Sequence, residues 1–346
     1  MRLATTLPYA KSFAAAAQKV VELEKAGLDL VYVAEAYGND AVSAMGYLAA
    51  VTETIEIGSG ILPLYSRTPT LLAMTAAGMD DVSDGRFVLG LGASGPQVVE
   101  GFHGVPYDAP LGRTREIIEI CRAVWAREAP LVYEGRQYQL PLPDGRGTGL
   151  GKPLKLVSHP RRTRIPIHVA ALGPRNVAQT AELAEGWLPL FFWPEKLDGA
   201  FGAELREGAA RRHPSLPALD IIAGGMVAIG DDVDDVLDRA RPMAALYIGG
   251  MGAKGANFYN ALVARYGYEK EAADIQDLYL SGRKKEAAAA VPRDLLRSTN
   301  LIGSEGFVRD RLACYAAAGV STLNLGLVGP TDVSVAMLDT LRSLMP

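Results

Sequence analysis

Two hydrophobic patterns alternate along the chain. Short runs of β-branched and other apolar residues, typical of buried strands, are separated by longer segments in which apolar residues recur with helical spacing. Eight runs have the strand pattern, at about residues 2–7, 28–35, 55–62, 86–94, 165–173, 187–192, 219–230 and 321–329. The helical segments between them include one that ends at Gly27 and one over residues 68–83.

This repeated order of strand and helix indicates an α/β fold. The strand runs are apolar on both faces, as expected for a parallel sheet that is covered by helices. Eight such units are typical of a (β/α)8 TIM barrel. The alternative is a doubly wound sheet, which would place a glycine-rich fingerprint after its first strand. The first strand here is followed by PYAKSF, so we predict the barrel.

Two segments interrupt the repeated order, at about residues 130–165 and 240–300. The first contains LVYEGRQYQL, which predicts a hairpin turning at Glu134-Gly135, and the second is mostly helical and rich in alanine. Neither has the composition of a flexible linker. We therefore predict one domain over residues 1–346, with insertions in the βα loops. Because the active site of a barrel lies at the C-terminal ends of its strands, both insertions are expected to wall that site.

Composition narrows the class of protein. The chain is 49% hydrophobic and has a formal net charge of −4, which gives no reason to expect nucleic acid or a membrane as a partner. Its two cysteines, Cys121 and Cys314, lie far apart in helical runs, so we expect reduced thiols rather than a disulfide. The N-terminus shows no secretion signal, and no apolar span of membrane length occurs. We expect a cytoplasmic protein.

The residues that follow the predicted strands should converge on one pocket, because a barrel gathers its strand ends. These positions carry few reactive side chains: Glu35 is a lone carboxylate, and there is no lysine and no serine–histidine pair. The four histidines, His103, His159, His168 and His213, lack metal-ligand spacing, so no metal site is expected. Small residues, backbone and aromatic rings remain. Such a pocket suits a large planar cofactor that supplies its own chemistry.

The stretch ALGPRNVAQTAELAEG gives the strongest local indication of a ligand. A strand stops at Gly173-Pro174, and a helix begins near Asn176. Free backbone N–H groups and the positive end of the helix dipole favour an anion at such a point, and Arg175 is adjacent. The phosphate of a cofactor is one interpretation. A plain helix start that is fixed by Pro174 is the other.

Four stretches give the chain a resemblance to a known family. They are VYVAEAYGND, EIGSGILPLYSRTPTLLAMTAAGMDDVSDGRFVLGLGASG, HVAALGPRNVAQTAELAEGW and YAAAGVSTLNLGL, and their order and spacing cover nearly the whole chain. In these stretches the chain resembles the luciferase-like monooxygenase superfamily, in particular the branch of oxidoreductases that use the deazaflavin coenzyme F420. The resemblance implies a TIM barrel that binds a flavin-like ring.

The resemblance also implies which residues hold the cofactor. In this family the third strand ends in a bulge with a non-prolyl cis peptide bond, which corresponds here to Gly60-Ile61, and Ile61 would press against the ring. The main chain of residues 93–95 would follow the pyrimidine edge and ribityl chain, and residues 173–176 would surround the phosphate. The implied set is Glu35, Gly60, Ile61, Ala93, Ser94, Gly95, Gly173, Pro174, Arg175 and Asn176.

One position departs from the family pattern. Related F420 dehydrogenases often have a histidine directly after the acidic residue of the second strand, and that histidine is proposed as the proton donor. Here Ala36 follows Glu35, which excludes a histidine mechanism at this position. The nearest candidates for a catalytic side chain are Glu35 and Tyr37, since a carboxyl group in an apolar pocket can serve as an acid. Hydrogen bonding of either residue to the cofactor is the alternative.

The segment GKPLKLVSHPRRTR, residues 151–164, contains five cations and no acid: Lys152, Lys155, Arg161, Arg162 and Arg164. F420 ends in an anionic oligoglutamate tail, whereas FMN stops at its phosphate. One hypothesis is that this segment lies near the phosphate end and attracts the tail. The alternative is a solvated basic loop.

The resulting hypothesis is a coenzyme F420-dependent oxidoreductase that transfers a hydride between the deazaflavin ring and a small organic substrate. The alternatives are an FMN-dependent luciferase-like monooxygenase and a non-catalytic cofactor-binding protein. The aromatic residues expected on the substrate side are Tyr37, Tyr65, Phe191, Phe192 and Trp193. We also expect a homodimer, for which the alanine-rich helices at 240–290 offer a surface.

Overall fold

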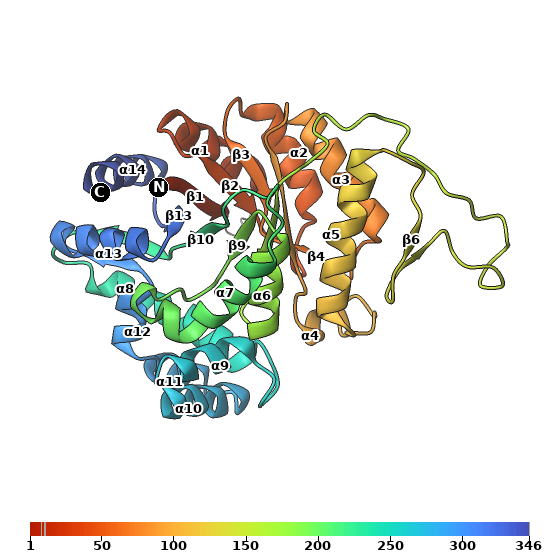
Figure 1. Cartoon of the computed structure of the whole chain (residues 1–346). Helices are drawn as coiled ribbons and strands as arrows, with labels where there is room; N and C mark the ends of the chain where they lie inside the picture. The colour runs from red at the N-terminus through yellow and green to blue at the C-terminus, as the bar shows by residue number, and fades with distance from the viewer. Residues whose placement is uncertain (8, 10–11, 346) are drawn as a thin grey trace.

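The centre of the molecule is a closed barrel of parallel strands (Figure 1). The computed structural model describes residues 1–7, 9 and 12–345. In order around the barrel, the strands are β1 (Arg2–Leu7), β2 (Leu30–Val33), β3 (Glu56–Ser59), β5 (Phe87–Gly92), β8 (Ile167–Ala170), β9 (Gly186–Leu188), β10 (Asp220–Ala223) and β13 (Val320–Leu327). Pairing of β1 with β13 closes the barrel. Each predicted strand run contains one of these eight strands, which confirms the (β/α)8 prediction.

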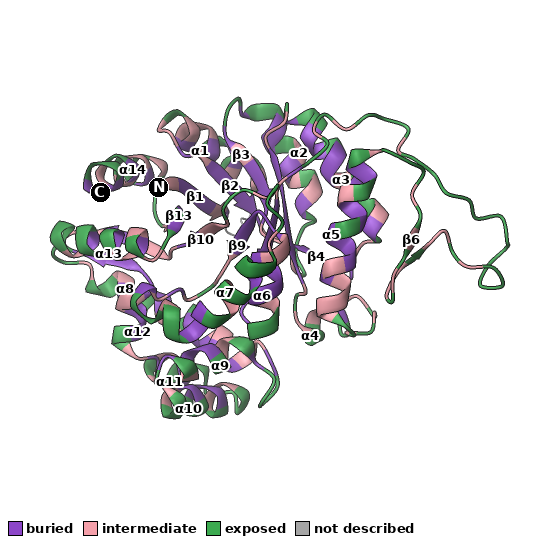
Figure 2. Ribbon diagram, in the orientation of Figure 1, coloured by how far each residue is buried: buried purple, intermediate pink, exposed green. Residues whose placement is uncertain are grey.

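Helices cover the outside of the barrel, with their buried residues turned toward the strands (Figure 2). They are α1 (Phe13–Lys25), α2 (Ala41–Val51), α3 (Pro69–Val82), α5 (Pro110–Ala126), α6 (Pro174–Leu183), α7 (Ala203–Arg211), α13 (Glu305–Ala317) and α14 (Thr331–Leu344). Four of them have a side chain that caps the first turn by accepting a backbone N–H. The capping residues are Ser12, Asp40, Thr68 and Ser304.

The third strand of the barrel carries one extra residue. Ile57 and Gly58 of β3 pair with residues 30 positions later in β5, whereas Leu62 and Pro63, which form β4 (Leu62–Pro63), pair with residues 29 positions later. The register therefore shifts by one residue between the two strands, which is a β-bulge. The Ser59 hydroxyl ties the bulge to β5, because it donates to the carbonyl oxygen of Gly90 and accepts from its N–H, both at 2.8 Å.

A buried polar pair fills the inside of the barrel. The hydroxyl of Tyr32 on β2 lies 2.7 Å from Nδ1 of His168 on β8, and both side chains are almost fully buried. Gly58 leaves the room for the Tyr32 ring, because a Cβ at residue 58 would lie 2.7 Å from it. Burial lowers the pKa of His168 to about 4, since a charged imidazole would lose its solvation there.

The predicted strand at 219–230 is two strands in the structure. The chain leaves the barrel at Gly224-Gly225, and β11 (Met226–Ile229) then pairs with the end of β13 and with β12 (Leu301–Gly303). A Cβ at residue 224 would lie 2.4 Å from the carbonyl oxygen of Asn324. Only glycine fits this close approach of two backbones. The three-residue β12 was not predicted, because it directly follows a helical segment.

The first insertion runs along the outside of α5. It forms a hairpin of β6 (Tyr133–Glu134) and β7 (Gln139–Leu140), whose loop spans residues 135–138 rather than turning at Glu134-Gly135 as predicted. The buried carboxylate of Glu116 on α5 holds this turn by accepting from the backbone N–H groups of residues 136–138. The chain then extends away from the barrel and returns to the start of β8 (Figure 1).

The second insertion covers the C-terminal ends of the strands, which we call the mouth of the barrel. Its elements are α8 (Asp234–Ala245), the π-helical turn η3 (Leu246–Gly250), α9 (Phe258–Arg265), α10 (Glu269–Leu280), α11 (Lys284–Ala289) and α12 (Arg293–Ser298). Arg265 donates to the carbonyl oxygen of Leu172 after β8, and the Tyr266 hydroxyl donates to that of Phe191 after β9. These bonds fix the second insertion to the mouth.

Two expectations from composition concern the cysteines and membrane-crossing helices. Both cysteines are free thiols, with Cys121 buried and Cys314 half-buried. Across the described part of the chain, none of the helices combines the length and the apolar character that a membrane crossing requires.

Candidate functional site

The mouth brings the ends of three neighbouring strands together. Ile61, in the bulge of the third strand, lies beside the end of β5, since a Cβ at Gly92 would lie 2.8 Å from its side chain. The same Cβ would lie 3.6 Å from Ala170 at the end of β8. Gly92 therefore gives the Ile61 side chain room to lie against the end of β5, next to β8. The predicted residues 93–95 and 173–176 follow directly from these two strands.

The Gly60–Ile61 peptide bond is cis, as the family resemblance implies. Residue 60 has no room for a side chain, because its Cβ would lie 2.9 Å from Cβ of Tyr32 on β2. Ile61 is half-buried and turns its side chain toward the end of β5. The sequence Gly60-Ile61 therefore fits both strands beside the bulge: glycine leaves room for Tyr32 on β2, and the branched side chain packs toward β5.

Backbone strain marks the end of β5. Ser94 has φ of 57°, a left-handed conformation that residues other than glycine seldom adopt. It is exposed, and Gly95 after it begins the short helix α4 (Pro96–Val99) without any side-chain cap. The main chain at Ala93, Ser94 and Gly95 is thus presented to the mouth with little side chain around it.

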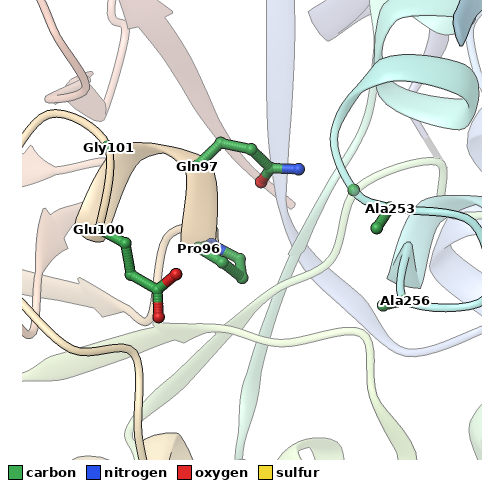
Figure 3. Close-up of a pocket in the computed structure, with 7 residues that line it drawn as sticks. Pro96, Gln97, Glu100, Gly101, Ala253 and Ala256 are labelled. Atoms are coloured by element: carbon green, nitrogen blue, oxygen red, sulfur yellow. The ribbon is translucent and has the colours of Figure 1, made fainter.

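An open pocket of about 440 Å³ adjoins this main chain. Pro96, Gln97, Glu100 and Gly101 line one wall, and the loop at residues 252–256 of the second insertion lines the other (Figure 3). In the close-up, the Gln97 side chain extends across the gap toward Ala253. The pocket lies between α4 and the insertion.

The start of α6 has the properties of an anion site. Gly173 is its N-cap, no side chain caps the first turn, and Pro174 occupies the first helical position. Arg175 is exposed, while Oδ1 of Asn176 is buried and has no hydrogen-bond partner. Exposed N–H groups at a helix start attract anions. The uncapped first turn and the exposed Arg175 therefore fit a phosphate, whereas Oδ1 of Asn176 is an acceptor and adds no donor.

Glu35 forms an ion pair at the mouth that the sequence did not predict. Its carboxylate accepts two hydrogen bonds from Arg67, at 2.5 and 2.9 Å, and a third from the backbone N–H of Ala41 at the start of α2. The two side chains are only 9% and 13% exposed. The hydrogen bond to Glu35 raises the pKa of the Arg67 guanidinium. Arg67 and Ala41 therefore occupy both oxygens of Glu35, which leaves few positions for a ligand.

Arg67 could have been found in the sequence. It is the only cation between Ile55 and Asp84, and it directly follows the predicted third strand. In a parallel barrel the second and third strands are neighbours, so a lone carboxylate after one and a lone guanidinium after the other should meet. Comparing the residues that follow neighbouring strands would therefore have predicted the ion pair of Glu35 and Arg67.

Tyrosine side chains surround the mouth on the side of β1 and β2. Tyr37 is 66% exposed and lies with its ring centre 6.4 Å from that of Phe102. Burial raises the pKa of Tyr247 on η3, and the neighbouring Tyr37 raises it further. Burial also raises the pKa of Tyr9, and the neighbouring Tyr247, Tyr37 and Glu35 raise it further. Tyr247 was not predicted, because nothing in an alanine-rich helical segment indicates a π-helical turn.

The structure separates the predicted substrate-side aromatics into two groups. Phe191 reaches the mouth: it has φ of 55° and packs edge-on against Tyr247, with 6.0 Å between ring centres. Phe192 is core, since it is 1% exposed and packs on Trp187. Tyr65 is buried and donates its hydroxyl to the backbone of Asp108. Alternation along the chain explains the difference between the two phenylalanines, which point to opposite sides.

Trp193, the last of the predicted aromatics, also packs within the protein. Its ring is half-buried and stacks against Tyr268, with 6.2 Å between ring centres, and it lies 5.6 Å from the ring of Tyr266. Both tyrosines belong to the second insertion. Trp193 therefore attaches the insertion to the barrel.

The basic segment does not lie at the phosphate end, and that hypothesis is wrong for its arginines. Arg162 donates to Asp80 and to the carbonyl oxygen of Phe87, and Arg164 pairs with Glu185. Phe87 is the first residue of β5, at the opposite end of the barrel from the mouth. These arginines neutralise carboxylates at the bottom of the barrel, which the sequence could not show because the acids lie far away in the chain.

The site holds no arrangement of metal ligands. Within the described residues, histidine, cysteine and acidic side chains form no group of three that could bind an ion. His168 is committed to Tyr32 inside the barrel. The mouth therefore presents main chain, aromatic rings, one neutralised ion pair and an uncapped helix start.

A closed (β/α)8 barrel with such a mouth belongs to the class of cofactor-binding TIM barrels. The family model described as luciferase-like monooxygenase matches residues 1–322, and the chain belongs to this family. A relative from Mycobacterium tuberculosis, whose name assigns it to the coenzyme F420-dependent oxidoreductases, is 43% identical over 309 residues, or 89% of each chain. The 5,10-methylenetetrahydromethanopterin reductase of Archaeoglobus fulgidus is 27% identical over 89% of this chain and 88% of its own.

Solved structures agree on the fold. The coenzyme F420-dependent tetrahydromethanopterin reductase of Methanopyrus kandleri superposes with a TM-score of 0.78 at 22% identity, covering 98% of this chain and 97% of its own. An F420-dependent secondary alcohol dehydrogenase, in complex with an F420-acetone adduct, gives 0.76 at 16% identity over 100% and 99%. The FMN complex of a Baeyer–Villiger monooxygenase from Pseudomonas putida gives 0.67 at 16% identity over 100% and 99%. At such identities these likenesses show the fold alone.

Proposed function

We propose that this protein is a coenzyme F420-dependent oxidoreductase that transfers a hydride between the deazaflavin ring and a small organic substrate. The observation that carries the proposal is the occurrence, at neighbouring strand ends, of the apolar Ile61 side chain against the end of β5 and of the uncapped start of α6 after β8. One suits a flat ring and the other a phosphate. The relative at 43% identity is assigned by its name to the coenzyme F420-dependent oxidoreductases, and the relative at 27% identity is named as a reductase.

In this proposal the predicted cofactor residues contact different parts of F420. Ile61 supports one face of the ring, and Gly92 gives the Ile61 side chain room to lie against β5. The backbone at Ala93, Ser94 and Gly95 donates to and accepts from the polar edge of the ring. Residues 173–176 bind the phosphate through the N–H groups of the first turn of α6. The tail of the cofactor then leaves through the open pocket that Gln97 borders.

The bound deazaflavin supplies the hydride chemistry, and the chain supplies position and shelter. The insertion helices above the mouth keep water from the reacting face, because they are tied to the ends of β8 and β9. Phe191 and Tyr247 form an apolar wall on which a small organic substrate can lie. A wall of aromatic rings favours an uncharged substrate.

Tyr37 is the proposed proton donor, with Tyr247 beside it. Both hydroxyls stand at the mouth, and Tyr37 is exposed enough to exchange its proton with solvent. Glu35 is proposed to position Tyr37 rather than to donate a proton, because Arg67 and the N–H of Ala41 already occupy its oxygens. The pair would fix the segment after β2 on which Tyr37 lies.

The proposal places the reaction in the cytoplasm, which agrees with two free thiols at Cys121 and Cys314. Turnover of the reduced cofactor is the direct test. The protein would be mixed with reduced F420 and a panel of ketones, enones and imines, and deazaflavin absorbance would be followed. We expect substrate-dependent oxidation of F420 and no oxygenated product with reduced FMN and oxygen. Oxygen-dependent turnover with FMN would favour a monooxygenase, and binding of F420 without turnover on any substrate would favour a cofactor carrier.

A further inference from the structure

Phe191 has a backbone conformation that phenylalanine seldom adopts. Its φ of 55° lies in the left-handed region, where a side chain crowds its own backbone. Such a conformation costs stability and persists only where surrounding contacts enforce it. Here the hydroxyl of Tyr266, which is itself buried, donates to the carbonyl oxygen of Phe191 at 2.9 Å. The second insertion therefore holds the segment after β9 in a strained form.

This backbone directs the Phe191 ring toward two tyrosines of the second insertion. Its ring centre lies 6.0 Å from that of Tyr247 on η3 and 6.4 Å from that of Tyr259 on α9, with interplanar angles of 84° and 88°. The two tyrosine rings lie 4.8 Å apart at 72°. The three rings are thus close to mutually perpendicular. We call Phe191, Tyr247 and Tyr259 the aromatic corner.

The aromatic corner borders the mouth of the barrel. All three of its residues are half-buried, so each keeps part of its surface open. Burial raises the pKa of Tyr259, and the neighbouring Tyr247 and Tyr107 raise it further. Tyr37, which follows β2, is in turn a neighbour of Tyr247. The corner therefore lies between the segments that follow β2, β5 and β9.

Three perpendicular rings suit a flat ligand better than a puckered one. Aromatic rings have a negative face and a positive edge, so they prefer offset-stacked or edge-to-face contacts. A planar conjugated group can stack on one ring of the corner and turn its edges toward the other two. A saturated ring has neither a flat face nor a polarised edge. The nearby Glu35 and Arg67 neutralise each other, so they offer no free charge to an ionic ligand.

We propose that the aromatic corner binds the planar conjugated part of the substrate, which is an aryl ketone or a similar conjugated carbonyl compound. Phe191 is the residue that determines this specificity, and Tyr266 is a positioning residue that holds Phe191 in its strained conformation. A relaxed backbone at residue 191 would change the direction of the ring, and the corner would lose one of its three sides. The inference rests on the proposed function, because it names the substrate class of the same site.

Two ketones that differ in the planarity of their ring test the substrate class without turnover. Acetophenone has a flat ring, whereas cyclohexyl methyl ketone carries the same acetyl group on a puckered ring of similar size. Both would be titrated calorimetrically into the full-length protein, with and without oxidised F420. We expect acetophenone to bind at least about tenfold more tightly. Equal affinities, tighter binding of the cyclohexyl ketone, or no binding of either ketone overturns the proposal.

This affinity ratio is separate from the proposed function. If acetophenone is preferred but reduced F420 is not oxidised by any ketone, the aromatic corner stands and the proposed reaction fails. If F420 is oxidised by both ketones and they bind equally well, the proposed reaction stands and the aromatic corner fails.

Substitution of Phe191 tests its role in specificity. Phe191→Leu keeps an apolar side chain but removes the ring, and should reduce the advantage of acetophenone to about twofold or less. Phe191→Tyr restores a ring and should restore the advantage. Phe307→Leu removes a half-buried phenyl ring on α13 and is the matched control. An advantage that survives in Phe191→Leu, or that Phe307→Leu abolishes, contradicts the assignment of Phe191.

A single hydroxyl tests the positioning role of Tyr266. Tyr266→Phe removes the hydrogen bond to residue 191 and should lower the advantage of acetophenone by about threefold or more. Tyr315→Phe is the matched control, since the Tyr315 hydroxyl donates to the carbonyl oxygen of the adjacent Phe192 at 3.3 Å. It should leave the ratio of the two affinities unchanged. An unchanged ratio in Tyr266→Phe, or an equal loss in both variants, would mean that Tyr266 does not position Phe191.

The strain at residue 191 has its own test. Glycine adopts a φ of 55° without crowding, whereas alanine does not. Phe191→Gly should therefore melt about 1–3 °C above Phe191→Ala, although glycine ordinarily lowers stability. The reverse order would show that the backbone at residue 191 is relaxed, and Tyr266 would then have no strained conformation to hold.

Discussion

The carboxylate of Glu35 and the guanidinium of Arg67 form a two-point ion pair at the mouth of the barrel, with N–O distances of 2.5 and 2.9 Å. The pair joins the segment after β2 to the segment after β4, two neighbouring strand ends. Both side chains are nearly buried, so neither charge has water as a substitute partner. Removing either side chain therefore leaves the other ionic group without its partner in a nearly buried place.

Removing one partner should destabilise the fold. Arg67→Met leaves the Glu35 carboxylate without its partner and should lower the free energy of unfolding by about 3 kcal/mol. The double variant Glu35→Gln, Arg67→Met should lose less than the sum of the single losses. Urea unfolding gives all three values. The control Arg239→Met breaks an exposed pair with Asp235 and should cost less than about 1 kcal/mol. Strictly additive losses at residues 35 and 67 would contradict the pairing.

His168 should make stability depend on pH. Burial holds its pKa at about 4 in the folded protein, against about 6.5 when unfolded, so between these values the unfolded state binds more protons. Stability should therefore fall as pH drops from 6.5 toward 4, by about 2 kcal/mol between pH 6.5 and 5. His168→Gln keeps an acceptor for the Tyr32 hydroxyl and cannot titrate. Urea midpoints at pH 7 and 5 should show a smaller loss in this variant; equal losses in both proteins would rule out His168 as the cause.

The start of α6 should recognise the phosphate of the cofactor. Asn176→Asp places a negative charge at the uncapped helix start and should weaken F420 binding by about tenfold or more, which corresponds to about 1.4 kcal/mol. Binding of a deazaflavin that lacks the phosphate should not change. Gln139→Glu adds the same charge on the exposed hairpin and serves as control. Fluorescence quenching measures each affinity. If both ligands weaken equally, the phosphate does not bind at residues 173–176.

Tyr37 should affect turnover more than binding. Tyr37→Phe removes only the hydroxyl and should lower kcat by about 100-fold on the best substrate of the panel, the usual contribution of a general acid. The dissociation constant of F420 should stay within about twofold. Tyr247→Phe should show a smaller loss of the same kind, and Tyr279→Phe on α10 is the control. A full kcat in Tyr37→Phe would mean that the proton comes from elsewhere.

Local patterns in the sequence were sufficient for the barrel and for the backbone part of the site. Apolar runs of strand length identified all eight barrel strands, since each is buried on both faces. The proline and glycine at 173–174 identified the start of α6, because these residues act on their own backbone. The bulge at Gly60-Ile61 rested on family resemblance, and its glycines are explained only by Tyr32 on the adjacent strand.

What the sequence missed depends on contacts between distant residues. Arg162 belongs with Asp80 at the bottom of the barrel, although in the chain it looks like part of a free basic loop. The strand at 219–230 was divided by β13, whose backbone meets Gly224. Tyr247 reaches the mouth through a π-helical turn, which has no local signature in this segment. Asp80 and the backbone of β13 lie 80 or more residues away in the chain from Arg162 and Gly224. Tyr247 lies in irregular backbone.

Side-by-side titration with F420 and FMN tests the central claim most directly. The claim is that the strand ends at Ile61 and Gly92, together with the start of α6, bind a deazaflavin cofactor. Absorbance and fluorescence would be followed with both cofactors under the same conditions. We predict a one-to-one complex with F420 at micromolar affinity or tighter, and binding of FMN at least about 100-fold weaker. Equal or tighter binding of FMN, or no binding of either cofactor, would contradict the account.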